Sequence, residues 1–163
     1  AVGAAIALGE HLAVKPEQIV EALEEFKPPE FMLQLNASKQ GAAVLDDGYS
    51  SNPRGFLAAL EFLSELKKLN TQRQRTVLLT AGIVDLGEKS EEIHRHLAKE
   101  AKKVVDQVLY CGVSGKNEFG KVFAADLVTD KQEIRQHIDQ LTKNDILLLE
   151  GRVPPSFRNY LGI

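Results

Sequence analysis

From residue 42 onward, short apolar segments alternate with longer segments whose apolar residues recur at helical spacing. The apolar segments have uncharged interiors, as in TVLLT and ILLL, which is typical of strands buried on both faces of a parallel sheet. The segments between them carry the period of amphipathic helices. Because strands and helices alternate, the sequence favours an α/β fold: a Rossmann-like, mainly parallel sheet with helices on both faces.

The pattern also assigns the individual elements. We expect a hairpin turn at SKQG (38–41), between the first two strands, and Ser90 as the N-cap of its helix. Strands are predicted at 31–37, 42–46, 76–82, 107–112, 127–129 and 145–151, and helices at 54–69, 90–104, 116–123 and 131–142.

The first thirty residues have a different character. Residues 2–13 and 17–26 are predicted helices, and KPPE (27–30) is the best candidate for a linker because prolines interrupt helices. The chain opens on an apolar helix with neither an initiator methionine nor a basic leader. We therefore expect residues 1–27 to be the helical tail of a neighbouring domain, and residues 31–163 to form a domain of their own.

The composition limits the possible partners. With 44% hydrophobic residues, 26% charged residues and a net charge of −3, the chain is ordinary for a globular domain and lacks the basic character of a nucleic-acid-binding protein. No apolar run is long enough to span a membrane. Cys111 is the only cysteine, so an internal disulfide is impossible and a reducing cytoplasm is the expected location. Cys111 itself is predicted to be a buried small hydrophobe.

Four polar segments follow predicted strands: DDGYSSNP, TAGIVDLGEKS, CGVSGKN and EGRVPP. Ligands of such sheets bind outside the carboxyl ends of the strands, so these segments are expected to line one ligand-binding edge. Neither a P-loop nor a dinucleotide fingerprint occurs among them. Gly82 and Gly87 therefore indicate a structural loop rather than a phosphate cradle.

Asp47 allows two interpretations. Its carboxylate could hold Mg²⁺ through water or accept a hydrogen bond from an ammonium group. Alternatively, the polar cluster caps the helix that follows, through Ser50, Ser51 or Asn52, and this would leave Asp47 without a role.

Other polar residues carry weaker signals. His94 and His96 are two residues apart on a helix, which does not suit a metal pair, and both are expected to be solvated. Glu150 and Arg152 follow the last strand and could form a salt bridge or contact a ligand.

Two ordered motifs resemble a known family. DDGYSSNP (46–53), followed by RGFLAALEFLSEL, is similar to a DDSYNANP motif that opens a helix, and TAGIVDLGEKSEEIH (80–94) is similar to LGDMLELGEESEELH. Both motifs occur in this order in the C-terminal portion of the Mur ligases, and the resemblance covers essentially the whole chain. It is strongest with the branch that adds D-alanyl-D-alanine to a UDP-muramoyl tripeptide.

The resemblance implies an ATP-dependent, ADP-forming amide ligase of peptidoglycan synthesis in the bacterial cytoplasm, acting through an acyl phosphate. It carries Asp47, Tyr49 and Asn52 over as substrate- or nucleotide-phosphate-binding residues; Arg54 is a further candidate, because a guanidinium suits a carboxylate. ATP and Mg²⁺ would be bound mainly by the protein's own central domain. No catalytic residue and no metal ligand is assigned to this chain.

The chain departs from the family pattern at several places. The Walker-type GxxGK[ST] loop is absent, so the chain alone is expected to be inactive. Gly82 replaces an aspartate, and Glu150 stands where the family often has a lysine. These departures leave open a related ligase with a different acceptor. A folylpolyglutamate synthase is disfavoured because Ser51, not histidine, precedes Asn52. A binding module that kept the fold without catalysis also remains an alternative.

Overall fold

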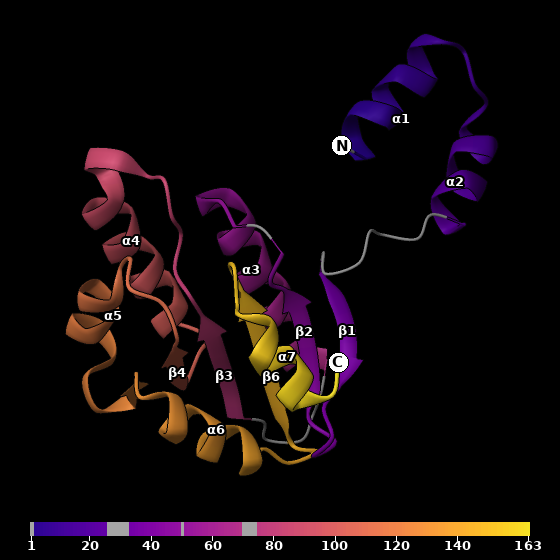
Figure 1. Ribbon diagram of the computed structural model, residues 1–163. Helices are drawn as coiled ribbons and strands as arrows, with labels where there is room; N and C mark the ends of the chain where they lie inside the picture. The colour runs from indigo at the N-terminus through magenta and orange to yellow at the C-terminus, as the bar shows by residue number, and fades with distance from the viewer. Residues whose placement is uncertain (1, 26–32, 50, 70–74) are drawn as a thin grey trace.

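The computed structural model describes residues 2–25, 33–49, 51–69 and 75–163. Within these residues, six strands form one sheet in the order β1-β2-β6-β3-β4-β5 (Figure 1). The strands are β1 (Gln34–Ala37), β2 (Ala43–Asp47), β3 (Arg75–Thr80), β4 (Gln107–Tyr110), β5 (Leu127–Val128) and β6 (Asp145–Glu150). The α-helices are α1 (Val2–His11), α2 (Pro16–Glu24), α3 (Pro53–Leu69), α4 (Ser90–Lys102), α5 (Lys116–Phe123), α6 (Lys131–Asp139) and α7 (Pro155–Leu161); η1 (Gly87–Lys89) and η2 (Ala124–Asp126) are 3-10 turns.

The sheet is parallel except at one edge. Strand β1 pairs with β2 antiparallel, and all the other neighbouring strands are parallel. The hairpin between β1 and β2 is closed at the predicted turn, where the backbone N–H of Ser38 donates to Ala42 O and that of Gly41, at φ 84°, donates to Ser38 O. The Rossmann-like prediction is confirmed.

The two faces of the sheet are both buried because alternate residues of each strand point to opposite sides. Leu45, Leu78 and Leu148 face a core that includes residues of α3, α4 and α5. Their neighbours along the strands, such as Val44 and Leu79, face a second core with residues of α6 and α7. Helices therefore cover both faces, and the ends of the strands remain available for loops.

The predicted elements hold with small shifts at their ends. Helix α3 begins at Pro53, one residue early, and α4 and α6 end two and three residues sooner than expected. The assignment of Ser90 as an N-cap was wrong: Lys89 occupies that position without a side-chain cap, and the Ser90 hydroxyl lies instead 3.2 Å from Nδ1 of His94. The sequence pattern did not identify Asp130, whose carboxylate caps α6 by accepting from the N–H groups of Gln132 and Glu133.

Both N-terminal helices form where they were expected. Helix α2 starts at Pro16 and has no buried residue. The expected linker at 27–30 lies outside the described residues, as do residues 31 and 32 of the first predicted strand. The division into residues 1–27 and 31–163 stays a prediction.

None of the described helices is long and apolar enough to cross a membrane.

Candidate substrate site at the carboxyl edge of the sheet

The segments that follow β2, β3 and β6 converge at the carboxyl edge of the sheet. Ser51, Gly82, Ile83, Val84, Asp85 and Arg152 line a cavity of about 220 Å³ there. The segment after β4 reaches the same place, since the hydroxyl of Ser114 donates to Ile83 O at 3.0 Å. The prediction that the polar segments meet at one edge is confirmed.

Asp47 and Glu150 end adjacent parallel strands as register partners. Each of the two carboxyl groups shifts the pKa of the other, and Oε1 of Glu150 accepts a bond of 2.5 Å from the Ser51 hydroxyl. Asp47 is half-buried, whereas Glu150 is completely buried. Ser51 thereby ties the DDGYSSNP segment to the end of β6.

Burial controls the protonation of this pair because it disfavours the charged form of a carboxyl group. Burial raises the pKa of Glu150 to about 9, partly offset by the bond from Ser51 and reinforced by the nearby Asp47. Burial likewise raises the pKa of Asp47, against the lowering effect of hydrogen bonds from the Leu33 backbone and the Glu150 side chain. At neutral pH, Glu150 is therefore un-ionised. Of the two possibilities left open for Glu150 and Arg152, a salt bridge between them is absent from the ion pairs of the described residues.

The preceding residue, Asp46, is paired differently. Nη2 and Nε of Arg158 on α7 donate to its carboxylate at 2.8 and 3.1 Å, and both side chains are largely buried. Asp46 also accepts from the backbone N–H of Gly48 at 3.1 Å. Asp46 is thus occupied in holding α7 against β2, and Asp47 is the carboxylate of the motif that reaches the edge.

The remaining predicted site residues follow Asp47. Tyr49 is exposed, as is Arg54, whose side chain forms no hydrogen bond or ion pair with any other described residue. Asn52 caps α3: its Oδ1 accepts from the N–H groups of Arg54 at 3.1 Å and Gly55 at 2.9 Å. The capping alternative is therefore correct for Asn52, while the ligand-binding roles of Asp47, Tyr49, Asn52 and Arg54 stay predictions.

The loop after β3 is held in place by a hydrogen bond to His94. Nε2 of this histidine accepts from the Ile83 N–H at 3.1 Å, and Nδ1 lies 2.8 Å from Ser90 O, to which it donates in the matching tautomer. His94 is fully buried, so the expectation of a solvated residue was wrong; His96 is exposed, as expected. The helical spacing alone could not show that the loop folds back over this face of α4.

Gly82 sits at φ 74° in the same loop. A Cβ there would overlap Ser114 O and the hydroxyl of Tyr110, which bond each other. Because the protein itself fills that space, the structural interpretation of this glycine is confirmed. The aspartate found in the family motif would not fit here without rearrangement.

Cys111 shows none of the features of an activated nucleophile. It is half-buried against the second core and donates to Thr80 O at 3.3 Å. Burial raises the pKa of its thiol to about 11, which keeps the thiol protonated at neutral pH.

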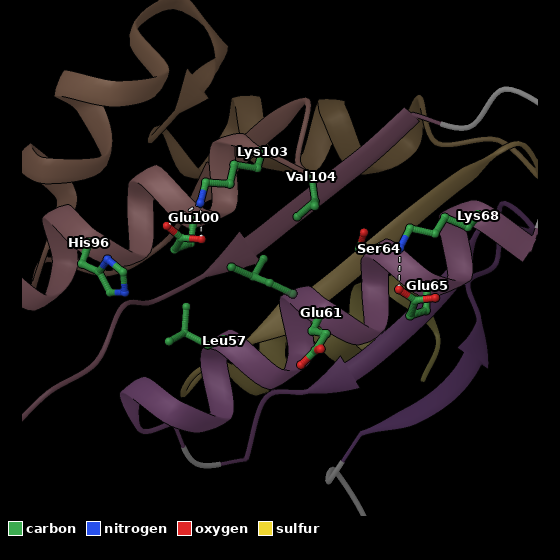
Figure 2. Close-up of a pocket in the computed structure, with 10 residues that line it drawn as sticks. Leu57, Glu61, Ser64, Glu65, Lys68, His96, Glu100, Lys103 and Val104 are labelled. Atoms are coloured by element: carbon green, nitrogen blue, oxygen red, sulfur yellow. Dashed lines mark hydrogen bonds and ion pairs between the residues drawn. The ribbon is translucent and has the colours of Figure 1, made fainter.

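A larger groove of about 590 Å³ lies between α3 and α4, on one side of the sheet (Figure 2). Two ion pairs of its lining each join neighbouring turns: Lys68 with Glu65 in α3, and Lys103 with Glu100 at the end of α4, each at 2.6 Å (Figure 2). Such exposed pairs within one helix are typical of a solvated surface. Size alone therefore does not make this groove the functional site.

Comparison with known proteins decides the family. The Mur ligase, glutamate ligase domain family matches residues 32–153. The chain belongs to this family. The matched residues include both motifs and every residue that lines the cavity at the carboxyl edge of this Mur ligase domain.

This Mur ligase domain is also similar to individual proteins. It is 24% identical over 156 residues to the UDP-N-acetylmuramoyl-tripeptide–D-alanyl-D-alanine ligase of Bacillus subtilis, covering 91% of this chain and 33% of the relative. The structure resembles MurF ligase from Thermotoga maritima in complex with ADP (TM-score 0.72, 18% identity, 96% of this chain, 36% of that one). It also resembles MurF from Acinetobacter baumannii (TM-score 0.71, 22% identity, 93% of this chain, 33% of that one). The Mur ligase domain thus spans about a third of the relatives it matches.

Proposed function

We propose that this Mur ligase domain is the C-terminal part of an ATP-dependent, ADP-forming ligase that adds D-alanyl-D-alanine to a UDP-muramoyl tripeptide through an acyl phosphate. The observation that carries the proposal is the convergence of the two family motifs: Ser51 of the first and Gly82–Asp85 of the second line one cavity. Two segments separated by a helix and a strand are thereby placed to act on one ligand.

The chemistry of this edge suits the completion of a site that another domain begins. Phosphoryl transfer depends mostly on positioning and charge stabilisation, so a closing domain contributes by orienting groups. Arg152 and Arg54 are exposed cations after β6 and β2, placed to contact phosphate or carboxylate oxygens. Asp47 is the carboxylate that could face an ammonium group.

ATP and Mg²⁺ are assigned mainly to the central domain. Within the described residues no group of three or more acidic, histidine or cysteine side chains could hold a metal ion. The Asp47–Glu150 pair also shares a proton rather than offering two free carboxylates. The described residues therefore do not fit a magnesium site of their own.

The surface of α1 and α2 supports a contact with the rest of a larger protein. Leu8, Val20 and Leu23 are exposed on these helices, and Leu12 is exposed directly after α1. Apolar residues gathered in this way favour packing against a further surface. We assign residues 1–27 to the end of the central domain and residues 31–163 to the closing domain, in a cytoplasmic bacterial enzyme that supports cell-wall growth, cell shape and division.

A related ligase with another acceptor is the second candidate, favoured by Glu150. The family lysine at this position would bring a positive charge, whereas Glu150 forms an acidic pair with Asp47. The loss of that positive charge beside the edge would change which acceptor is preferred.

The test is product analysis by the full-length protein. The protein would be incubated with ATP, Mg²⁺, UDP-muramoyl tripeptide and either D-alanyl-D-alanine or a panel of single amino acids. The products would be identified by mass spectrometry. The proposal expects the pentapeptide product with equimolar ADP. Ligation of a different acceptor would establish the second candidate. No ligation with any acceptor would leave the binding module as the better description.

A further inference from the structure

We propose that Asp47 accepts the proton that the incoming amine must lose before it attacks, and that Glu150 is the positioning residue that holds Asp47 for this step. The proposal rests on the proposed ligase function and adds a role that the comparisons do not assign.

The first support is the placement of the two carboxyl groups. Asp47 and Glu150 are Cα partners at the last residues of β2 and β6, and Thr80 is the partner of Glu150 on the other side. Asp47 is half-buried, and Ser51, which donates to its partner Glu150, lines the cavity at this edge. Glu150 is completely buried behind it and can act only through Asp47 or Ser51.

The second support is the incomplete pairing of Glu150. Ser51 satisfies Oε1, whereas Oε2 is buried and receives no hydrogen bond from an N–H or hydroxyl group of the described residues. A buried oxygen left in this way is costly unless it carries the proton of an un-ionised carboxyl group and donates it to a neighbour. Hydrogen bonding to the Asp47 carboxyl is the interaction that remains to this side chain.

The third support is that no described cation forms an ion pair with either carboxyl group. In the described parts of the chain, no ion pair involves Asp47 or Glu150. The charged groups around them are Asp46, which Arg158 of α7 already binds, and the exposed Asp85 and Arg152 on the loops after β3 and β6. An ammonium group entering this edge would therefore find Asp47 as an unneutralised partner.

The protonation states suit the role. An amine is present as ammonium at neutral pH and is not nucleophilic until it loses a proton. A base works best when its pKa lies near the working pH, and burial moves the pKa of Asp47 upward in that direction. Glu150, whose pKa is about 9, stays protonated and donates to Asp47, which fixes the orientation of the accepting oxygen.

Amide formation removes two protons from the ammonium nitrogen. The ammonium nitrogen gives one proton to Asp47, and its freed lone pair forms the C–N bond to the carbonyl carbon of the acyl phosphate. The C–O bond to phosphate breaks, and the leaving phosphate takes the electron pair and the second nitrogen proton. Asp47 later returns its proton to solvent.

The experiment separates amine deprotonation from acyl-phosphate formation. The full-length protein would be given ATP, Mg²⁺ and UDP-muramoyl tripeptide with either D-alanyl-D-alanine or hydroxylamine. Hydroxylamine is largely uncharged at neutral pH, so it traps the acyl phosphate without needing a base. Asp47→Asn is expected to lower amide formation by about 100-fold or more, within the range of general base catalysis, and to leave hydroxamate formation within about threefold.

Glu150 is tested in the same assay. Glu150→Gln keeps the shape of the protonated acid and a hydrogen-bond donor, and is expected to keep amide formation within about tenfold; Glu150→Ala is expected to lose far more, again sparing the hydroxamate. Amide formation that Glu150→Gln retains and Glu150→Ala loses would show that Glu150 acts by holding Asp47 in position and not through a negative charge. Glu61→Gln, in the groove between α3 and α4, is the control and is expected to change neither product.

Three results would overturn the proposal. Equal loss of both products in Asp47→Asn would place Asp47 in acyl-phosphate formation, and unchanged amide formation would show that Asp47 takes no proton. If the wild-type protein forms neither product, the proposed function itself fails and this role fails with it. Hydroxamate formation by the wild-type protein distinguishes that case from the other two.

Discussion

At the scale of single residues, the sequence predicted where polar residues lie along the fold better than it predicted which side chains they contact. Asp47 and Asn52 were predicted at and just after the carboxyl end of β2, and they lie there. The bond from Ser51 to Glu150 joins residues 99 positions apart, and the brace from His94 to Ile83 depends on how a loop folds back. Neither contact leaves a periodic signal. The departure at Glu150 was visible, but only burial shows that it is un-ionised.

Glu150 should make stability fall as pH rises. The pKa of Glu150 is raised to about 9 in the folded protein from an ordinary value near 4.5, so the folded state binds the proton more tightly than the unfolded state in this window. Unfolding free energy is therefore lost between pH 4.5 and 9, by at most about 1.4 kcal/mol per pH unit. Glu150→Gln cannot ionise and should flatten this slope in urea unfolding at several pH values. Identical slopes would show that Glu150 is already ionised in the folded protein.

Gly82 should tolerate no side chain. A Cβ at this position would overlap Ser114 O and the hydroxyl of Tyr110, in addition to the strain of a left-handed residue. Gly82→Ala is expected to cost about 1–3 kcal/mol more than Gly87→Ala, because overpacking adds to backbone strain. Gly87 is also left-handed, at φ 56°, but has no atom within 4 Å of a Cβ, so it is the matched control. Equal losses in thermal unfolding would mean that the loop can move aside.

At the scale of elements, the period of the apolar residues predicted the sheet and its covering helices, because buried strands and amphipathic helices repeat at different intervals. The ends of the elements shifted because local contacts decide them: the Ser90 hydroxyl turns to His94 instead of capping. Helix α7 was not predicted, since PPSFRNYL is short and begins with two prolines. Contacts with β2 define its place.

The ion pair between Asp46 and Arg158 should be the main polar link between β2 and α7. Arg158→Ala would leave the carboxylate of Asp46 buried and unpaired, at an expected cost of about 3–5 kcal/mol. Lys68→Ala, which breaks the exposed pair with Glu65, should change the unfolding free energy by less than about 1 kcal/mol. Chemical denaturation of both variants provides the comparison. A loss below 1 kcal/mol for Arg158→Ala would mean that water reaches Asp46.

At the scale of the whole molecule, the family could be predicted because its two motifs are ordered along the chain, and the match over residues 32–153 confirms it. The fold brings those motifs together at one edge, as parallel topology requires. The acceptor could not be predicted, because Gly82 and Glu150 depart from the motifs at the positions that shape this edge. The structure shows that a side chain at position 82 would overlap Ser114 O and the hydroxyl of Tyr110, and that Glu150 accepts a hydrogen bond from Ser51.

The most direct test compares the carboxyl edge with the larger groove. ADP release by the full-length protein, with UDP-muramoyl tripeptide and D-alanyl-D-alanine together, would be measured for Asp47→Ala and for Glu61→Ala in the groove between α3 and α4. The account predicts release that needs both substrates, falls by about 100-fold or more in Asp47→Ala and is unchanged in Glu61→Ala. Full activity in a folded Asp47→Ala protein, or a selective loss in Glu61→Ala, would contradict it.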